Sequence, residues 1–163
     1  MKLAVLYFSL SGHTKQMAEE IVSGMTEVPG VEAKAFSITD FDASFVQESA
    51  AVVLGTPVYM ASMAHQMHSF LQTTARQSGI PGKLCGAFAT EDYVHGGGEA
   101  AIEEILKYCL VMGCLTYSGG GAFGVPIIHL GPVAVSDDLS KYAPTFRTYG
   151  TRMAQTAKRL FEQ

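Results

Sequence analysis

An apolar run followed directly by a polar loop opens the chain, and this pairing limits the folds that the sequence can adopt. Residues 3–8 (LAVLYF) are all apolar, as in a strand of a parallel sheet that is buried on both faces. Six mostly polar residues follow, Ser9-Leu10-Ser11-Gly12-His13-Thr14, and a helical pattern begins directly after them. A strand, a short loop and a helix in this order predict the first βαβ unit of an α/β protein.

The loop at residues 9–14 is suited to hold an anion. The first turn of a helix has unpaired N–H groups and the positive end of the helix dipole, and both favour a negative charge. Ser9, Ser11 and Thr14 add hydroxyl groups, although the same residue types also serve simply as helix caps. Because the loop contains neither GxGxxG nor GxxxxGK[ST], it suits a single phosphate group better than a dinucleotide or a nucleoside triphosphate.

The rest of the chain alternates between helical and strand patterns. We expect helices at residues 15–25, 64–77, 100–112 and from 139 or 144 to 161, strands at 31–38, 50–55, 84–89 and 115–118, and a partly helical connector at 41–48. The final helix carries basic residues that we expect on its exposed outer face: Arg147, Arg152, Lys158 and Arg159. This alternation predicts a five-stranded parallel sheet in the order 2-1-3-4-5, with helices on both faces.

Residues 119–135 break this alternation. They are rich in glycine and apolar residues, and Pro126 and Pro132 interrupt them. We therefore expect an irregular insertion after the fifth strand, with a short strand at residues 126–129. The insertion would serve either as a contact between subunits or as a lid over its own sheet.

Two further loops are expected at the same edge of the sheet as residues 9–14, because the carboxyl ends of parallel strands meet there. Residues 56–63 follow the third strand, and Tyr59 in this loop would either stack on a flat ring or pin the loop to the core. Residues 90–99 follow the fourth strand and include three consecutive glycines, which are costly unless the backbone turns sharply or approaches a ligand. The three loops together predict a site for a ligand with a phosphate and a flat ring.

Composition narrows the class of protein. With 163 residues, 48% of them hydrophobic and 16% charged, the chain is long enough for one packed domain. A net charge of −4 without a cluster of Lys or Arg argues against nucleic acid as a partner. No apolar run approaches 18 residues, and the first strand leaves no room for a signal peptide, so we expect no membrane span and a cytoplasmic location.

Cysteine and histidine could in principle form metal sites. The three cysteines, Cys85, Cys109 and Cys114, are an odd number without CxxC spacing, so we assign neither a disulfide nor a metal site to them. Cys85 and Cys109 lie in a predicted strand and a predicted helix, and we expect them to be small buried hydrophobic residues. His65 and His68 share a helix face, but no third ligand accompanies them, so solvated histidines are favoured. We assign no metal.

Several motifs together resemble those of the WrbA-type NAD(P)H:quinone oxidoreductases in the flavodoxin-like superfamily. They are SLSGHT, GTPVYM, MAxQMxxFL, GKLxGAF, HGGGE and YGTRMAQTAKRL, and they run over nearly the whole chain. The resemblance implies a single flavodoxin-like domain over residues 1–163, folded as a three-layer sandwich that binds FMN. The implied cofactor-binding residues are Ser9, Leu10, Ser11, Gly12, His13 and Thr14 at the phosphate, Pro57, Val58, Tyr59 and Met60 along the isoalloxazine, and Thr90, Glu91, Asp92, Tyr93, Val94, His95, Gly96 and Gly97 around its pyrimidine edge.

The same resemblance implies NAD(P)H as co-substrate, a quinone-like acceptor and a homodimer or homotetramer. His95 is our candidate proton donor to the acceptor, with loop packing or flavin contact as its alternative role. The chain departs from the family pattern at three places: Val58 or Tyr59 replaces an Arg, Met112 replaces a His, and Trp is absent. A flavodoxin that carries electrons and a flavin-binding module without turnover therefore remain alternatives to the reductase.

Overall fold

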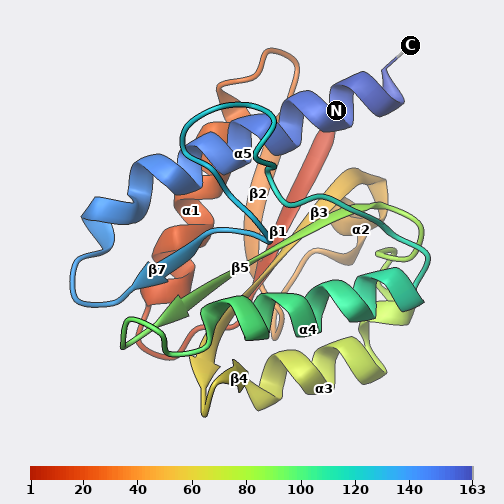
Figure 1. Cartoon of the computed structure of the whole chain (residues 1–163). Coiled ribbons are helices and arrows are strands. Elements are labelled where there is room, and N and C mark those ends of the chain that lie inside the picture. The colour runs from red at the N-terminus through yellow and green to blue at the C-terminus, as the bar shows by residue number, and fades with distance from the viewer. Residues whose placement is uncertain (163) are drawn as a thin grey trace.

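The computed structural model describes residues 1–162 as a parallel sheet with helices on both faces (Figure 1). The elements are β1 (Lys2–Tyr7), α1 (His13–Thr26), β2 (Glu32–Ser37), α2 (Ala43–Glu48), β3 (Ser49–Tyr59), β4 (Ser62–Met63), α3 (His65–Thr73), the 3-10 helix η1 (Ala75–Gln77), β5 (Leu84–Glu91), α4 (Gly98–Val111), β6 (Leu115–Thr116), β7 (Val133–Val135) and α5 (Leu139–Phe161). The main strands lie in the order β2-β1-β3-β5-β6, and each neighbouring pair is parallel. The predicted α/β class is therefore confirmed.

Each central strand contributes side chains to two separate cores. In β1, Leu3 and Val5 pack with buried residues of α1 and α5, while Ala4 and Leu6 pack with those of α2, α3 and α4 on the opposite face. Figure 1 shows α1 and α5 on one side of the sheet and α3 and α4 on the other. Since both faces of β1 are covered at residues 3–7, apolar residues are needed at each of these positions, which explains the continuous apolar run.

The predicted insertion lies within the fifth strand and not after it. β6 pairs with Leu84 and Cys85 at the start of β5, whereas β7 pairs with residues 89–91 at its end. Residues 117–132 loop out between these two short strands, and the short strand expected at residues 126–129 does not form. The insertion thus separates two halves of one strand, and β7 reaches the carboxyl edge of the sheet.

The longest helix, α5, contains a buried arginine. We expected Arg152 on the exposed outer face, and this prediction is wrong, since the residue is 7% exposed. Its guanidinium donates hydrogen bonds of 2.8–3.3 Å to five backbone carbonyls of the insertion, those of Gly119, Gly120, Phe123, Gly124 and Pro126. Arg152 therefore fixes the shape of the irregular segment.

Neither α5 nor any other helix in the described part of the chain is long and apolar enough to cross a membrane.

All three cysteines are buried, which confirms the prediction made for Cys85 and Cys109. Cys85 comes from β5, Cys109 from the end of α4 and Cys114 from the turn after it, and all three belong to the core under α3 and α4. Hydrogen bonding to Cys114, together with burial, raises the pKa of Cys109 to about 12. The neighbouring thiols and burial likewise raise the pKa of Cys85. Both side chains therefore stay in the poorly reactive thiol form at neutral pH.

Candidate functional site

The three predicted loops meet in one cleft at the carboxyl edge of the sheet. Its lining residues are Leu10 and Ser11 from the loop after β1, His13 at the start of α1, Pro57, Val58 and Tyr59 from β3, Thr90 and Glu91 from the end of β5, Asp92 directly after it, and Ser136 after β7. The cleft has a volume of about 210 Å³. Segments far apart in the sequence thus form one potential binding site.

The end of the cleft at α1 presents backbone N–H groups that the helix does not use. Gly12 is the N-cap of α1 with a left-handed φ of 95°, and no side chain hydrogen-bonds to the first turn. The first helical bond runs from Gln16 N to Gly12 O, so the N–H groups of residues 13–15 have no helical partner. The hydroxyls of Ser11 and Thr14 therefore do not cap this helix, and Ser9 bonds only to the N–H of the N-cap residue Gly12.

Hydroxyl and imidazole groups surround this helix terminus. Ser9 Oγ accepts a hydrogen bond from Gly12 N at 3.1 Å, and Ser11 Oγ lies 3.1 Å from His13 Nδ1. Thr14 lies beneath the loop, where its buried hydroxyl hydrogen-bonds to that of Thr90 at 2.8 Å. This last bond ties the loop after β1 to the end of β5, so Thr14 supports the cleft from below.

Residues 56–63, which we expected to form a loop, fold instead as a β-hairpin. β3 continues to Tyr59 and pairs with β4 through Val58↔Met63 and Tyr59↔Ser62. The turn consists of Met60 and Ala61, both left-handed with φ of 53° and 60°. Left-handed backbone at two consecutive residues matches the tight turn that a two-residue hairpin requires. The hairpin places Tyr59 at the cleft and leaves Met60 99% exposed at its tip.

The glycine-rich loop is held by a buried carboxylate. Glu91 is 7% exposed, and its Oε2 accepts a hydrogen bond from Gly98 N at 2.8 Å, at the start of α4. Gly97 has a φ of 106°, and a Cβ at this position would lie 2.6 Å from Ala61 Cα in the hairpin turn. Glycine is therefore required here both by the backbone conformation and by the close approach of the hairpin.

The other predicted cofactor-binding residues lie around the cleft without lining it. Met60, Tyr93, Val94 and His95 are exposed on its rim, Gly96 and Gly97 form the turn into α4, and Ser9, Gly12 and Thr14 build the loop after β1. His95, the candidate proton donor, has a left-handed φ of 66°. Its catalytic role remains a prediction.

Ser136 is the lining residue that the sequence reasoning missed. It follows β7, and its hydroxyl donates to Asp92 Oδ1 at 2.7 Å while its N–H donates to the Glu91 carbonyl at 2.8 Å. The sequence signal was the run Val133-Ala134-Val135 ending in Ser136. We had placed this run inside an insertion beyond the sheet, so the end of a strand was not expected there.

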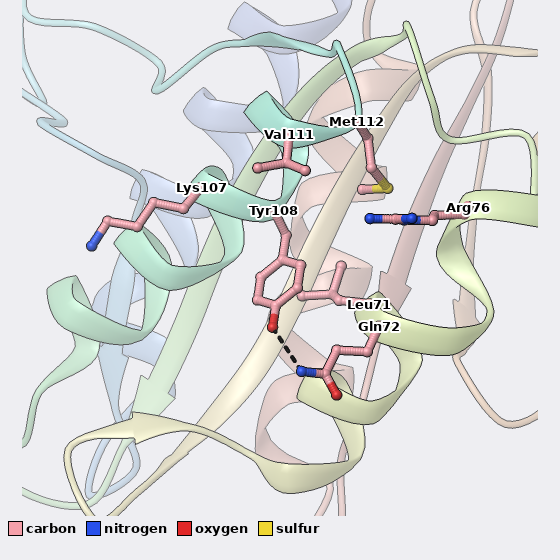
Figure 2. Close-up of a pocket in the computed structure, with 7 residues that line it drawn as sticks. All are labelled: Leu71, Gln72, Arg76, Lys107, Tyr108, Val111 and Met112. Carbon is pink, nitrogen blue, oxygen red and sulfur yellow. Dashed lines mark hydrogen bonds between the residues drawn. The ribbon is translucent and has the colours of Figure 1, made fainter.

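A second hollow lies between α3 and α4 (Figure 2). It measures about 420 Å³ and is lined by Leu71, Gln72, Arg76, Lys107, Tyr108, Val111 and Met112, none of which belongs to the predicted site. Figure 2 shows the hydrogen bond of 3.2 Å from Gln72 Nε2 to Tyr108 Oη, which crosses between the two helices. Met112, which stands where the resembled family has a His, therefore lines this hollow and not the cleft.

The cleft fits the flavin mononucleotide that the resemblance implies. Unpaired N–H groups and hydroxyls at the start of α1 suit its phosphate. A volume of about 210 Å³ is below the range of about 300–1,000 Å³ for pockets that enclose small molecules, so part of the ring system would extend over the rim. On that rim Tyr59 is 42% exposed and Tyr93 is 77% exposed, and both rings are available for stacking.

The chain is similar to proteins named flavodoxin and NAD(P)H dehydrogenase (quinone). A family model described as a flavodoxin domain matches residues 4–91. A protein named flavodoxin from Clostridium saccharobutylicum is 34% identical over 99% of this chain and 100% of its own length. A protein named NAD(P)H dehydrogenase (quinone) from Geobacter sulfurreducens is 30% identical over 69% of each chain. The solved structure of a flavodoxin from the domain Archaea superimposes with a TM-score of 0.79 and 25% identity, covering 97% of this chain and 99% of that chain. These similarities confirm the resemblance that the motifs predicted.

Proposed function

We propose that this chain, which belongs to the flavodoxin family, binds FMN in the cleft formed by its three loops and transfers electrons through it. The observation that carries the proposal is the convergence of an uncapped helix N-terminus, exposed tyrosine rings and a glycine-rich turn on one sheet edge. FMN, when bound, supplies the redox chemistry, and the protein determines its position and its access.

Each wall of the cleft has a distinct role in this proposal. The N–H groups of residues 13–15 and the Ser11 hydroxyl bind the phosphate, and no basic side chain is needed for this purpose. Tyr59 and Tyr93 stack on the ring system, with Pro57 and Val58 along its edge. Backbone N–H groups of the glycine-rich turn stabilise negative charge near the pyrimidine edge.

We propose further that the protein is an oxidoreductase that takes a hydride from NAD(P)H and passes two electrons to a quinone-like acceptor. The exposed rim at Met60 and Tyr93 supports this activity, because small molecules can reach the ring system there. His95, exposed on the same rim, would donate the proton that the reduced acceptor requires. Exposed apolar side chains of the insertion, Phe123, Val125 and Ile127, offer the contact for a homodimer or homotetramer.

One observation favours a second candidate, an electron carrier that does not react with NAD(P)H. The relative named flavodoxin is 34% identical over the full length of both chains, whereas a relative named NAD(P)H dehydrogenase (quinone) from Syntrophobacter fumaroxidans, matched over 98% of each chain, is 26% identical. A carrier would exchange electrons with a protein partner at the exposed rim.

Anaerobic mixing of the FMN-loaded protein with NADPH, followed at the visible flavin band, tests these candidates. Prompt loss of the band, and steady NADPH oxidation once a quinone is added, support the oxidoreductase. A band that stays unchanged with NADPH but disappears with dithionite supports the carrier. A protein that does not retain FMN contradicts the proposal as a whole.

A further inference from the structure

We propose that Glu104, on α4 and outside the three loops, is a positioning residue that holds the β3–β4 hairpin in its flavin-binding position. The inference rests on the proposed binding of FMN and assigns a residue that the three-loop description of the site leaves out. Glu104 would act through the hairpin that carries Tyr59 and would not itself touch the flavin.

The contacts of Glu104 are specific. Its Oε2 accepts a hydrogen bond from Ser62 Oγ at 2.8 Å and a second from Met63 N at 3.1 Å. Both partners belong to β4, the second strand of the hairpin. A carboxylate oxygen that accepts two hydrogen bonds is a strong and directional anchor, since bonds to a charged acceptor are stronger than neutral ones.

The hairpin is anchored by the burial of Met63 in the core, by the hydrogen bond of 2.9 Å from Ala64 N to Thr56 Oγ1 directly after β4, and by Glu104, which adds two bonds to β4 itself. β4 has only two residues and two ladder pairs, Val58↔Met63 and Tyr59↔Ser62. Its turn uses left-handed backbone at Met60 and Ala61, a conformation that is unfavourable for residues other than glycine. Such backbone persists only where the surrounding structure imposes it.

A close approach between the backbone just before α4 and the hairpin turn also supports the positioning of the hairpin by α4. The backbone of Gly97 approaches Ala61 so closely that a Cβ would lie 2.6 Å from Ala61 Cα. Gly97 immediately precedes α4, whose first residue Gly98 is held by Glu91 at 2.8 Å. α4 therefore connects the end of β5, the glycine-rich turn and the hairpin, so that two walls of the cleft are positioned as one unit.

Two substitutions separate the hydrogen bonds of Glu104 from its charge. Glu104→Gln keeps an oxygen that can accept both bonds, whereas Glu104→Ala removes them. The adjacent Glu103 provides a matched control, since it is exposed and pairs only with Lys107 at 2.9 Å among the described residues. Ser62→Ala removes one of the two bonds from the opposite side and serves as a second variant if Glu104→Ala does not fold.

The test measures the dissociation constant for FMN by fluorescence quenching, the flavin circular dichroism of the loaded protein and the hydrogen exchange of the Met63 amide without FMN. We expect Glu104→Ala to weaken FMN binding about tenfold and to alter the flavin dichroism, because the loss of charged hydrogen bonds frees the hairpin. The Met63 amide should exchange at least about tenfold faster in this variant. Ser62→Ala and Glu104→Gln should show smaller changes in the same direction, because the first removes one of the two bonds and the second replaces a charged acceptor by a weaker neutral one. Glu103→Ala should stay within about twofold of the unmodified protein.

Three outcomes would overturn the inference. Glu104→Ala could match Glu103→Ala in all three measurements, which would leave the hairpin independent of Glu104. Glu104→Gln could be as impaired as Glu104→Ala, which would make the charge and not the hydrogen bonds the cause. Unchanged Met63 exchange in both Glu104→Ala and Ser62→Ala would also refute it. Since exchange is measured without FMN, this result stays distinct from a failure of FMN binding itself.

Discussion

Replacing Arg152 should destabilise the fold more than replacing any exposed basic residue of α5. Its guanidinium donates to five carbonyls of the insertion, and the residue is 7% exposed. The variant Arg152→Met keeps most of the aliphatic stem but removes all five donors. The matched control is Arg159→Met, in the same helix, because Arg159 is exposed.

The expected loss follows from the fate of these carbonyls. Each carbonyl that stays buried without a donor costs about 1–3 kcal/mol, but water can reach those that lie near the surface. The five costs therefore do not add in full, and we expect a loss of about 3 kcal/mol in the free energy of unfolding. Arg159→Met should change this free energy by less than about 0.5 kcal/mol. Arg152→Lys should fall between the two, since an ammonium has three donors and lacks the planar fork of a guanidinium.

Urea unfolding, followed by far-ultraviolet circular dichroism, measures these free energies. Equal slopes in urea for the three variants would show that the denatured state is unchanged and that the midpoints can be compared. If Arg152→Met unfolded within about 0.5 kcal/mol of Arg159→Met, the five hydrogen bonds would contribute nothing and the explanation of the insertion would be wrong.

Two further predictions concern titratable groups away from the cleft. Cys85 and Cys109 are fully buried, and their pKa values are raised. At most one thiol per native chain, that of Cys114, should therefore react with a thiol reagent at neutral pH, whereas all three should react in urea. Two or more reactive thiols in the native state would contradict this prediction. Asp42 caps α2 by accepting from Phe45 N at 3.0 Å, and this bond lowers the pKa of its carboxyl group. A lowered pKa in the folded state means that the carboxylate stabilises the fold above its ordinary pKa and that this contribution is lost as the pH falls through the folded value. Asp42→Ala should therefore be less stable than the unmodified protein at pH 7, and the difference between their unfolding midpoints should narrow below about pH 4. A difference between the midpoints that does not depend on pH would refute this prediction.

The parts of the fold that follow from local pattern could be predicted from the sequence. Continuous apolar runs identified β1, β3 and β5 because these strands are buried on both faces. The convergence of the three loops followed from the rule that parallel strands end at one edge of the sheet. The loop at residues 9–14 was expected at the site for this reason, and its residues Leu10, Ser11 and His13 line the cleft.

The features that depend on distant partners could not be predicted in this way. Arg152 has helical spacing typical of an exposed residue, and only the carbonyls of a loop about 30 residues away make its burial favourable. The split of the fifth strand depends on pairing of β6 and β7 with opposite ends of β5. The short apolar run at residues 133–135 does not by itself indicate which strand it pairs with. The same limit explains why Ser136 was missed and why the hairpin at Met60 was expected to be a loop.

The central claim is that the N-terminus of α1 and its neighbouring hydroxyls bind the phosphate of FMN. Isothermal titration of the apoprotein with FMN and with riboflavin, which lacks the phosphate, tests this claim most directly. We expect FMN to bind at least about tenfold more tightly than riboflavin. Ser11→Ala should weaken FMN binding by about 1–3 kcal/mol and leave riboflavin binding unchanged. Equal affinities for the two flavins, or an FMN affinity that Ser11→Ala does not change, would contradict the assignment of the phosphate site.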